Sequence, residues 1–103
     1  MTEHSLKLND RYFDAVANGI KTFEIRKNDR RYCIGDTLVL YRVDDAGKYL
    51  TGAVLNGERL TEAYPSSQVD CVEVKVKYYL THNDFPDGIP EGYVVLSIER
   101  VKI

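Results

Sequence analysis

The residues best suited to chemistry lie together in one short charged segment, residues 21–31. Five basic and two acidic side chains give this segment a net formal charge of +3, whereas the whole chain carries −2 and the remainder therefore −5. Glu24 and Arg26 are two residues apart, so on a strand they would project from the same face. A carboxylate and a guanidinium held side by side can read a donor–acceptor pattern such as a nucleobase edge. Lys21 would add a point charge for a phosphate or a developing anion; the alternative is a solvated strand face with an ordinary ion pair.

Three further residues are candidates for contact with the same ligand. Arg30 and Arg31 could clamp a phosphate, although the alternative is a solvated loop. Tyr93 begins a predicted strand near the expected cleft and could stack on a base, as tyrosines do in RNA sites. The alternative for Tyr93 is a tyrosine of the core or rim.

The histidines and cysteines do not form a recognisable metal or redox pattern. His4 and His82 have no cysteine or aspartate partner at ligand spacing. Cys33 and Cys71 are far apart in sequence and match no metal motif, so we expect two reduced thiols. We therefore expect no metal and no other cofactor.

The charged segment should follow a short helix at residues 11–18. Asn9 and Asp10 supply capping side chains at its start, and Gly19 suits the left-handed conformation that ends a helix. One apolar stripe is expected to face the core, formed by Tyr12, Phe13, Val16 and Ala17.

Alternation of apolar and polar residues predicts strands along most of the remaining chain. Residues 44–47 have the composition of a hairpin turn, and residues 82–92 that of a loop. Residues 52–68 interrupt the rhythm and are expected to be a peripheral insertion. Strict alternation in residues 69–81 would place one set of side chains on a single face: Val72, Val74, Val76, Tyr78 and Leu80. The predicted strands are residues 5–8, 21–27, 37–43, 48–54, 69–81 and 92–102.

These elements predict a single α+β domain over residues 1–103, built as a small curved sheet or partly closed barrel. Apolar residues make up 44% and charged residues 29%, as in an ordinary globular protein. No window approaches the roughly 20 apolar residues that cross a bilayer. The first residues do not resemble a secretion signal, so we expect a cytoplasmic protein that does not bind membranes.

Residues 19–26, which read G-I-K-T-F-E-I-R, resemble the G-x-K-x-x-E-x-R signature of the ASCH family in the PUA-like superfold. Residues 34–38 resemble the G-D strand entry of that family, and residues 91–96 resemble its closing strand. The resemblance covers nearly the whole chain apart from residues 52–68, and it is greatest for a short, phage-associated bacterial branch without an assigned function.

The resemblance implies a PUA-like small β-barrel of about five or six strands with one early helix. It also implies a cleft lined by Lys21, Glu24 and Arg26 that binds RNA or a nucleotide. One similar bacterial group hydrolyses the acetyl amide of N-acetylcytidine, with a threonine nucleophile at the position of Glu24. A carboxylate there is better suited to act as a base or to read a ligand. The later acidic partner of that group has only Glu73 as a positional candidate.

Three functions follow as hypotheses, and the sequence leaves open whether the protein is an enzyme. The first is a module that reads a nucleoside or single-stranded RNA in the cleft of Lys21, Glu24 and Arg26. The second is an amidohydrolase of an acylated nucleoside, with Lys21 and Glu24 as the catalytic pair. The third is a phage or host protein–protein adaptor, which would have an exposed apolar patch and an inert cleft.

Overall fold

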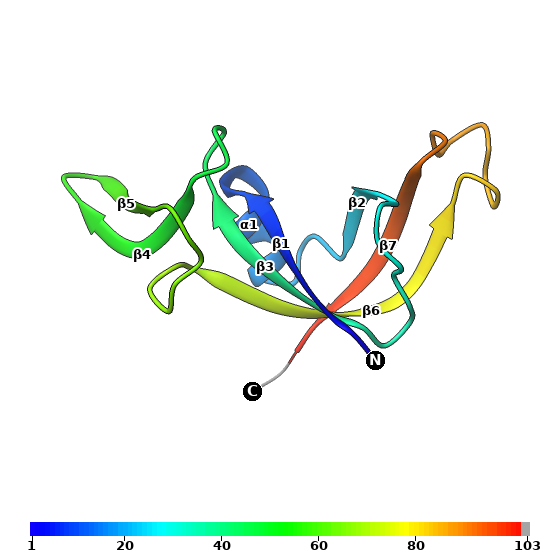
Figure 1. Ribbon diagram of the computed structural model, residues 1–103, viewed down its shortest axis with the longest axis horizontal. Helices are drawn as coiled ribbons and strands as arrows, with labels where there is room; N and C mark the ends of the chain where they lie inside the picture. The colour runs from blue at the N-terminus through cyan, green and yellow to red at the C-terminus, as the bar shows by residue number, and fades with distance from the viewer. Residues whose placement is uncertain (102–103) are drawn as a thin grey trace.

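The computed structural model describes residues 1–101, which form seven strands and one short helix. The strands belong to one curved sheet, with β4 and β5 at one end and the tips of β6 and β7 at the other (Figure 1). Helix α1, β1 and β3 lie between these two ends. The elements are β1 (Glu3–Asn9), α1 (Asp10–Ala17), β2 (Phe23–Lys27), β3 (Thr37–Val43), β4 (Tyr49–Leu55), β5 (Glu58–Glu62), β6 (Cys71–Thr81) and β7 (Tyr93–Arg100).

The predicted helix is confirmed, with its boundaries set by the expected residues. The side chain of Asn9 accepts a hydrogen bond of 3.0 Å from the backbone N–H of Arg11, which caps the first turn. At the other end, Gly19 takes a φ of +73°. The N–H groups of Gly19 and Ile20 then donate back to the last turn, so the helix closes with a Schellman motif.

The sheet is not closed into a barrel, which corrects the barrel expected from the sequence. The strand order is β2-β7-β6-β3-β4-β5. Outside this order, β1 pairs in parallel with β3 over the full length of both strands. Within residues 1–101, β1 and β2 form no ladder with each other, so a seam remains between them. Side chains of Lys7, Glu24 and Arg26 line this seam.

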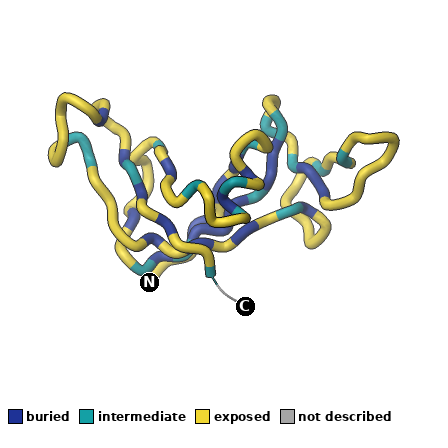
Figure 2. The backbone as a smooth tube through the Cα atoms, turned by 180° about the vertical axis from the view of Figure 1, so that it is seen from behind, coloured by how far each residue is buried: buried dark blue, intermediate teal, exposed yellow. Residues whose placement is uncertain are grey.

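The core fills the concave face of the sheet and contains apolar side chains from β1, β3, β6, β7 and the helix, together with Tyr32 of the loop after β2. Phe13 and Val16 of α1 cover this face, whereas Tyr12 of the predicted stripe is 45% exposed. The buried residues form a dark band along the centre of the molecule (Figure 2). Its most completely buried apolar members are Val16, Leu38, Leu40, Val74, Val76, Val94 and Leu96.

A bulge in β6 changes which residues share a face with the core. Val76 pairs with Ile98 and Tyr78 with Ser97, so one extra residue lies between the two pairs. Val76 is buried, but Tyr78 and Leu80 are 59% and 40% exposed. The prediction that all five apolar residues share one face is therefore wrong beyond Val76.

The region predicted as an insertion forms most of a hairpin arm, β4–β5. Asn56 and Gly57 both have positive φ, as in the two-residue turns that favour Asn-Gly. The tip of the arm is exposed, but its base is tied to the body by a bridge between Thr51 and Val69. The added strand β5 explains why the structure has more strands than predicted. Lys102, the last residue of the final predicted strand, lies outside the described residues.

No helix among residues 1–101 has the length and apolar character required to cross a membrane.

Candidate functional site

Lys21 is fixed by the end of helix α1. After the Schellman turn, the backbone N–H of Lys21 also donates to the carbonyl of Ala15, at 3.0 Å. Its ammonium group donates to the carbonyl of Phe23 and to Glu24 Oε1, both at 2.6 Å. It also lies 4.7 Å from the ring centre of Phe23 and 5.5 Å from that of Tyr12. Two aromatic rings and a carboxylate thus hold one cation in place.

Glu24 and Arg26 project from β2 toward the concave face, where they pair with Leu96 and Val94 of β7. Glu24 is only 3% exposed. Its second oxygen, Oε2, accepts a hydrogen bond of 2.9 Å from Arg26 Nε. The structure therefore brings Lys21, Glu24 and Arg26 together around one buried carboxylate, with a cation on each oxygen.

The apolar residues of β2 face the other way. Phe23 and Ile25 are 47% and 60% exposed on the outer face, while the charged residues occupy the inner one. This arrangement opposes the usual burial of apolar side chains. A strand that buries its carboxylate and exposes its isoleucine sacrifices stability, as is common at functional sites.

The three charged residues line a hollow of about 420 Å³ in the seam, which we call the Glu24 hollow. One wall comes from Lys7, Leu8 and Asn9 of β1, and Tyr12 of α1 adds an aromatic surface. The lining is mostly apolar with a few convergent polar groups, as in small-molecule sites. Within this hollow a carboxylate is flanked by donors from Lys21 and Arg26.

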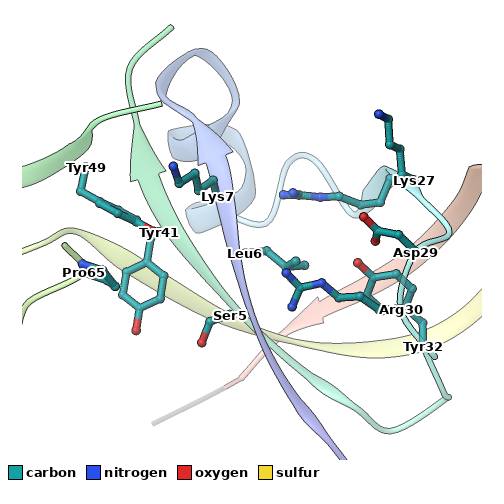
Figure 3. Close-up of a pocket in the computed structure, with 11 residues that line it drawn as sticks. Ser5, Leu6, Lys7, Lys27, Asp29, Arg30, Tyr32, Tyr41, Tyr49 and Pro65 are labelled. Carbon is teal, nitrogen blue, oxygen red and sulfur yellow. The ribbon is translucent and has the colours of Figure 1, made fainter. Parts of the chain in front are cut away.

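A second hollow of about 410 Å³ lies next to the first, and the two share Lys7 and Arg26. We call it the tyrosine hollow. Tyr41, Tyr49 and Pro65 lie on one side of β1, and the loop after β2 supplies the other side (Figure 3). The residues from β2 and this loop are Arg26, Lys27, Asp29, Arg30 and Tyr32.

The other residues predicted for the site are distributed differently. Arg30 lines the tyrosine hollow, whereas Arg31 is exposed and lines neither hollow. Tyr93 pairs with Lys27 on the outer face of the sheet, because its neighbour Val94 points inward. The structure therefore does not bring Arg31 and Tyr93 to Lys21, Glu24 and Arg26.

Residues that the sequence did not single out contribute much of both hollows. Lys7 lies between two buried leucines of β1 and lines both hollows. Tyr41 and Tyr49 come from β3 and β4, and their rings are nearly perpendicular with centres 6.0 Å apart. Their strand positions were predicted, but their closeness to the β2 loop depends on the parallel pairing of β1 with β3, which no local pattern signals.

A buried clip fixes β1 relative to the loop that carries Arg30. The Asp36 carboxylate, 1% exposed, accepts hydrogen bonds from the Thr2 and Cys33 N–H groups and lies 2.9 Å from His4 Nε2. Burial alone would raise the pKa of Asp36, but these hydrogen bonds outweigh it and hold the pKa at about 2. The His4 ring also packs against Tyr32, with ring centres 4.9 Å apart.

Tyr32 is the buried end of the tyrosine hollow. Burial raises the pKa of its phenol, and the positive charges of Arg26 and Arg30 offset part of that rise. The phenol therefore stays neutral and can donate or accept a hydrogen bond. Through His4 and Asp36, its position is coupled to the start of β1, which sets the spacing of the two walls.

Comparison with known proteins gives a family and a fold. The family described as "Domain of unknown function (DUF3850)" matches residues 3–98. An uncharacterized 12.9 kDa protein in the GpA 3′ region of Escherichia phage P2 is 53% identical over 87 residues, or 84% of this chain and 72% of the relative. The crystal structure of hypothetical protein PH0355 has a TM-score of 0.53 over 98% of this chain and 100% of that chain, at 15% identity. At this identity the likeness shows a shared fold alone.

Proposed function

Because the chain belongs to the DUF3850 family, a domain of unknown function, we propose its function from the site: it is a module that binds RNA or a nucleotide and reads one nucleobase in the Glu24 hollow. The observation that carries this proposal is the buried carboxylate of Glu24, held on one oxygen by Lys21 and on the other by Arg26. Each carboxylate oxygen can accept a further hydrogen bond, and Arg26 has N–H groups beyond Nε. Acceptors and donors in fixed positions match the mixed edge of a base.

The resemblance to the ASCH family supports the same site. Its signature falls on Gly19, Lys21, Glu24 and Arg26. Gly19 ends the helix, and the other three line the Glu24 hollow. Membership of that family stays a prediction, and with it the association with RNA.

Calorimetric titration with the four ribonucleosides and with short single-stranded RNAs tests this proposal. We expect saturable binding of at least one nucleoside. Glu24→Gln should weaken it about tenfold, since a hydrogen bond to a charged group contributes about 1.5 kcal/mol or more. Arg31→Ala is the matched control, because Arg31 is a nearby cation that lines neither hollow. The absence of binding by all nucleosides and RNAs would remove the proposal.

A second candidate function is hydrolysis of an acylated nucleoside such as N-acetylcytidine. The 2.6 Å contact between Lys21 and Glu24 in the hollow favours it, because such a pair can share a proton. Against it, the Lys21 ammonium donates to two acceptors and, while charged, has no lone pair to take a proton from water. Multiple turnover of N-acetylcytidine by the parent, abolished in Lys21→Ala, would establish the enzyme and displace the simple binding module.

The adaptor hypothesis has one favourable observation. Phe23, Ile25, Tyr78 and Leu80 expose apolar surface on the outer face of β2 and β6. An adaptor also requires an inert Glu24 hollow, so nucleoside binding in the titration above would count against it.

A further inference from the structure

We propose that the tyrosine hollow is a second subsite, which holds the phosphate and the neighbouring base of a single strand whose first base occupies the Glu24 hollow. The inference rests on the proposed function and deepens it. It specifies a ligand of at least two nucleotides joined by a phosphodiester, rather than a free nucleoside.

The charge of the tyrosine hollow favours an anionic ligand. Four cationic side chains and one carboxylate line it, a net formal charge of +3 in a chain whose total is −2. Arg30 is the most available of these cations. Its side chain forms no hydrogen bond or ion pair with another described residue, not even with Asp29 beside it. An unneutralised cation on one wall of a hollow is suited to a phosphate.

The opposite wall of the tyrosine hollow is suited to a base. Tyr41 and Tyr49 are partly exposed, and Pro65 lies beside them (Figure 3). The Lys7 ammonium lies 5.1 Å from the ring centre of Tyr49 and donates to Gly47, so this ring is held in place from one side. Aromatic side chains next to a positively charged groove are the usual platform for single strands, because every base has a face that can stack.

Arg26 joins the two hollows. It lines both, and its Nε is occupied by Glu24 at 2.9 Å. The outer nitrogens of its guanidinium form no hydrogen bond with another described residue. A phosphodiester between two nucleosides would lie at this junction, within reach of Arg26 and of Lys7, the other shared residue. The order of groups along the seam is then base, phosphate and base.

Three kinds of probe separate the contributions of the hollows: the four ribonucleosides, their 3′- and 5′-monophosphates, and the dinucleotides ApA, CpC, GpG and UpU. For the base that binds best, we expect affinity to rise about tenfold from nucleoside to dinucleotide, with the monophosphate between them. Only the phosphorylated probes should lose affinity with salt. A single phosphate contact predicts about a threefold loss between 50 and 200 mM salt.

Variants at neighbouring positions locate the effect. Arg30→Ala should weaken dinucleotide binding about fivefold and leave nucleoside binding unchanged, since Arg30 lines only the tyrosine hollow. Arg31→Ala, the adjacent arginine of the same exposed loop, should change neither by more than about twofold. Tyr49→Leu should reduce the advantage of the dinucleotide over the monophosphate, because leucine keeps an apolar side chain and loses the stacking ring. Circular dichroism verifies that each variant is folded.

The outcomes distinguish this inference from the proposed function. Equal affinity for nucleoside and dinucleotide, or equal losses in Arg30→Ala and Arg31→Ala, would overturn the second subsite while leaving the Glu24 hollow as a nucleoside site. Dinucleotide binding that is sensitive to Arg30→Ala but not to Glu24→Gln would keep the tyrosine hollow and remove the proposed reading of a base by Glu24. Binding of none of the probes would remove both.

Discussion

Glu24 and Arg42 are both charged, both at least 96% buried and both bound by groups of opposite charge, but their surroundings differ. Glu24 is one carboxylate between two cations, and it lines a hollow. Arg42 is one cation among three carboxylates, and it lines none of the hollows described above.

The Arg42 cluster attaches the helix to the sheet. The guanidinium donates to Asp10 and Asp14 of α1 at 2.5 and 2.7 Å, and to Asp70 at 3.2 Å. It also lies 4.1 Å from the ring centre of Phe13. Each of its three nitrogens has a carboxylate partner. Three charged hydrogen bonds therefore offset the cost of burying the guanidinium.

A structural charge differs from a candidate functional one in the hydrogen-bonding capacity that its cluster leaves unused. In the Arg42 cluster the buried group uses all its nitrogens internally, and its partners face solvent. In the Glu24 cluster the partners retain unused N–H donors and line an open hollow. Burial and ion pairing alone therefore do not identify a site; unused hydrogen-bonding capacity beside a hollow does.

The largest predicted effect separates the two clusters by stability. Arg42→Met should lower the free energy of unfolding by about 3 kcal/mol, since it removes three charged hydrogen bonds but keeps an apolar stem against Phe13. Glu24→Gln should lower it by only about 1 kcal/mol, because Lys21 and Arg26 can turn toward the solvent of the hollow. Urea unfolding at neutral pH measures both. If Glu24→Gln destabilises the protein more than Arg42→Met does, the distinction between the clusters is lost.

Asp36 offers a second structural charge and a smaller effect that depends on pH. Its pKa of about 2 in the folded protein lies below the ordinary value of 3.8. The unfolded chain therefore takes up this proton first as the pH falls. The resulting stabilisation is fully present above about pH 4, amounts to about 2 kcal/mol, and is lost as the pH falls toward 2.

The variant Asp36→Asn isolates that contribution. Unfolding free energies of the parent and the variant, measured between pH 2 and pH 5, should converge at the acid end and differ most at pH 5. A constant difference across this range would show that the lost stability comes from packing or from hydrogen bonds of the neutral side chain, and not from the ionised carboxylate.

Local signals in the sequence predicted the local structure well. Asn9 and Gly19 bound the helix because a capping oxygen and a left-handed residue act within a few bonds of the helix ends. The spacing of Glu24 and Arg26 likewise determines their common face, since alternation along one strand is a local property.

Pairing between distant segments could not be predicted in the same way. The bulge after Val76 reverses the faces of Tyr78 and Leu80 without any glycine or proline to mark it. The open seam results from the parallel pairing of β1 with β3 and the absence of a ladder to β2 within residues 1–101. Lys7, Tyr41 and Tyr49 reach the hollows only through that pairing. The motif therefore indicated Lys21, Glu24 and Arg26, whereas the residues on the opposite walls of the hollows depend on the sheet topology.

The smallest predicted effect concerns the hairpin arm. Among residues 1–101, its only ion pair to the body lies at the edge of the Arg42 cluster. Arg59 Nη1 lies 3.3 Å from Asp70, a carboxylate that Arg42 also binds. Replacing residues 53–60 by Asn-Gly removes Arg59 and the exposed tip but keeps the bridge between Thr51 and Val69 at the base of the arm. Because Asp70 keeps Arg42 and the removed apolar side chains are exposed, we expect a loss of less than about 1 kcal/mol in urea unfolding. Arg59→Met in the full chain is the control and should account for most of that loss. A loss as large as that of Arg42→Met, or a transition that is no longer cooperative, would mean that the arm belongs to the folding core and that the Arg42 cluster depends on it.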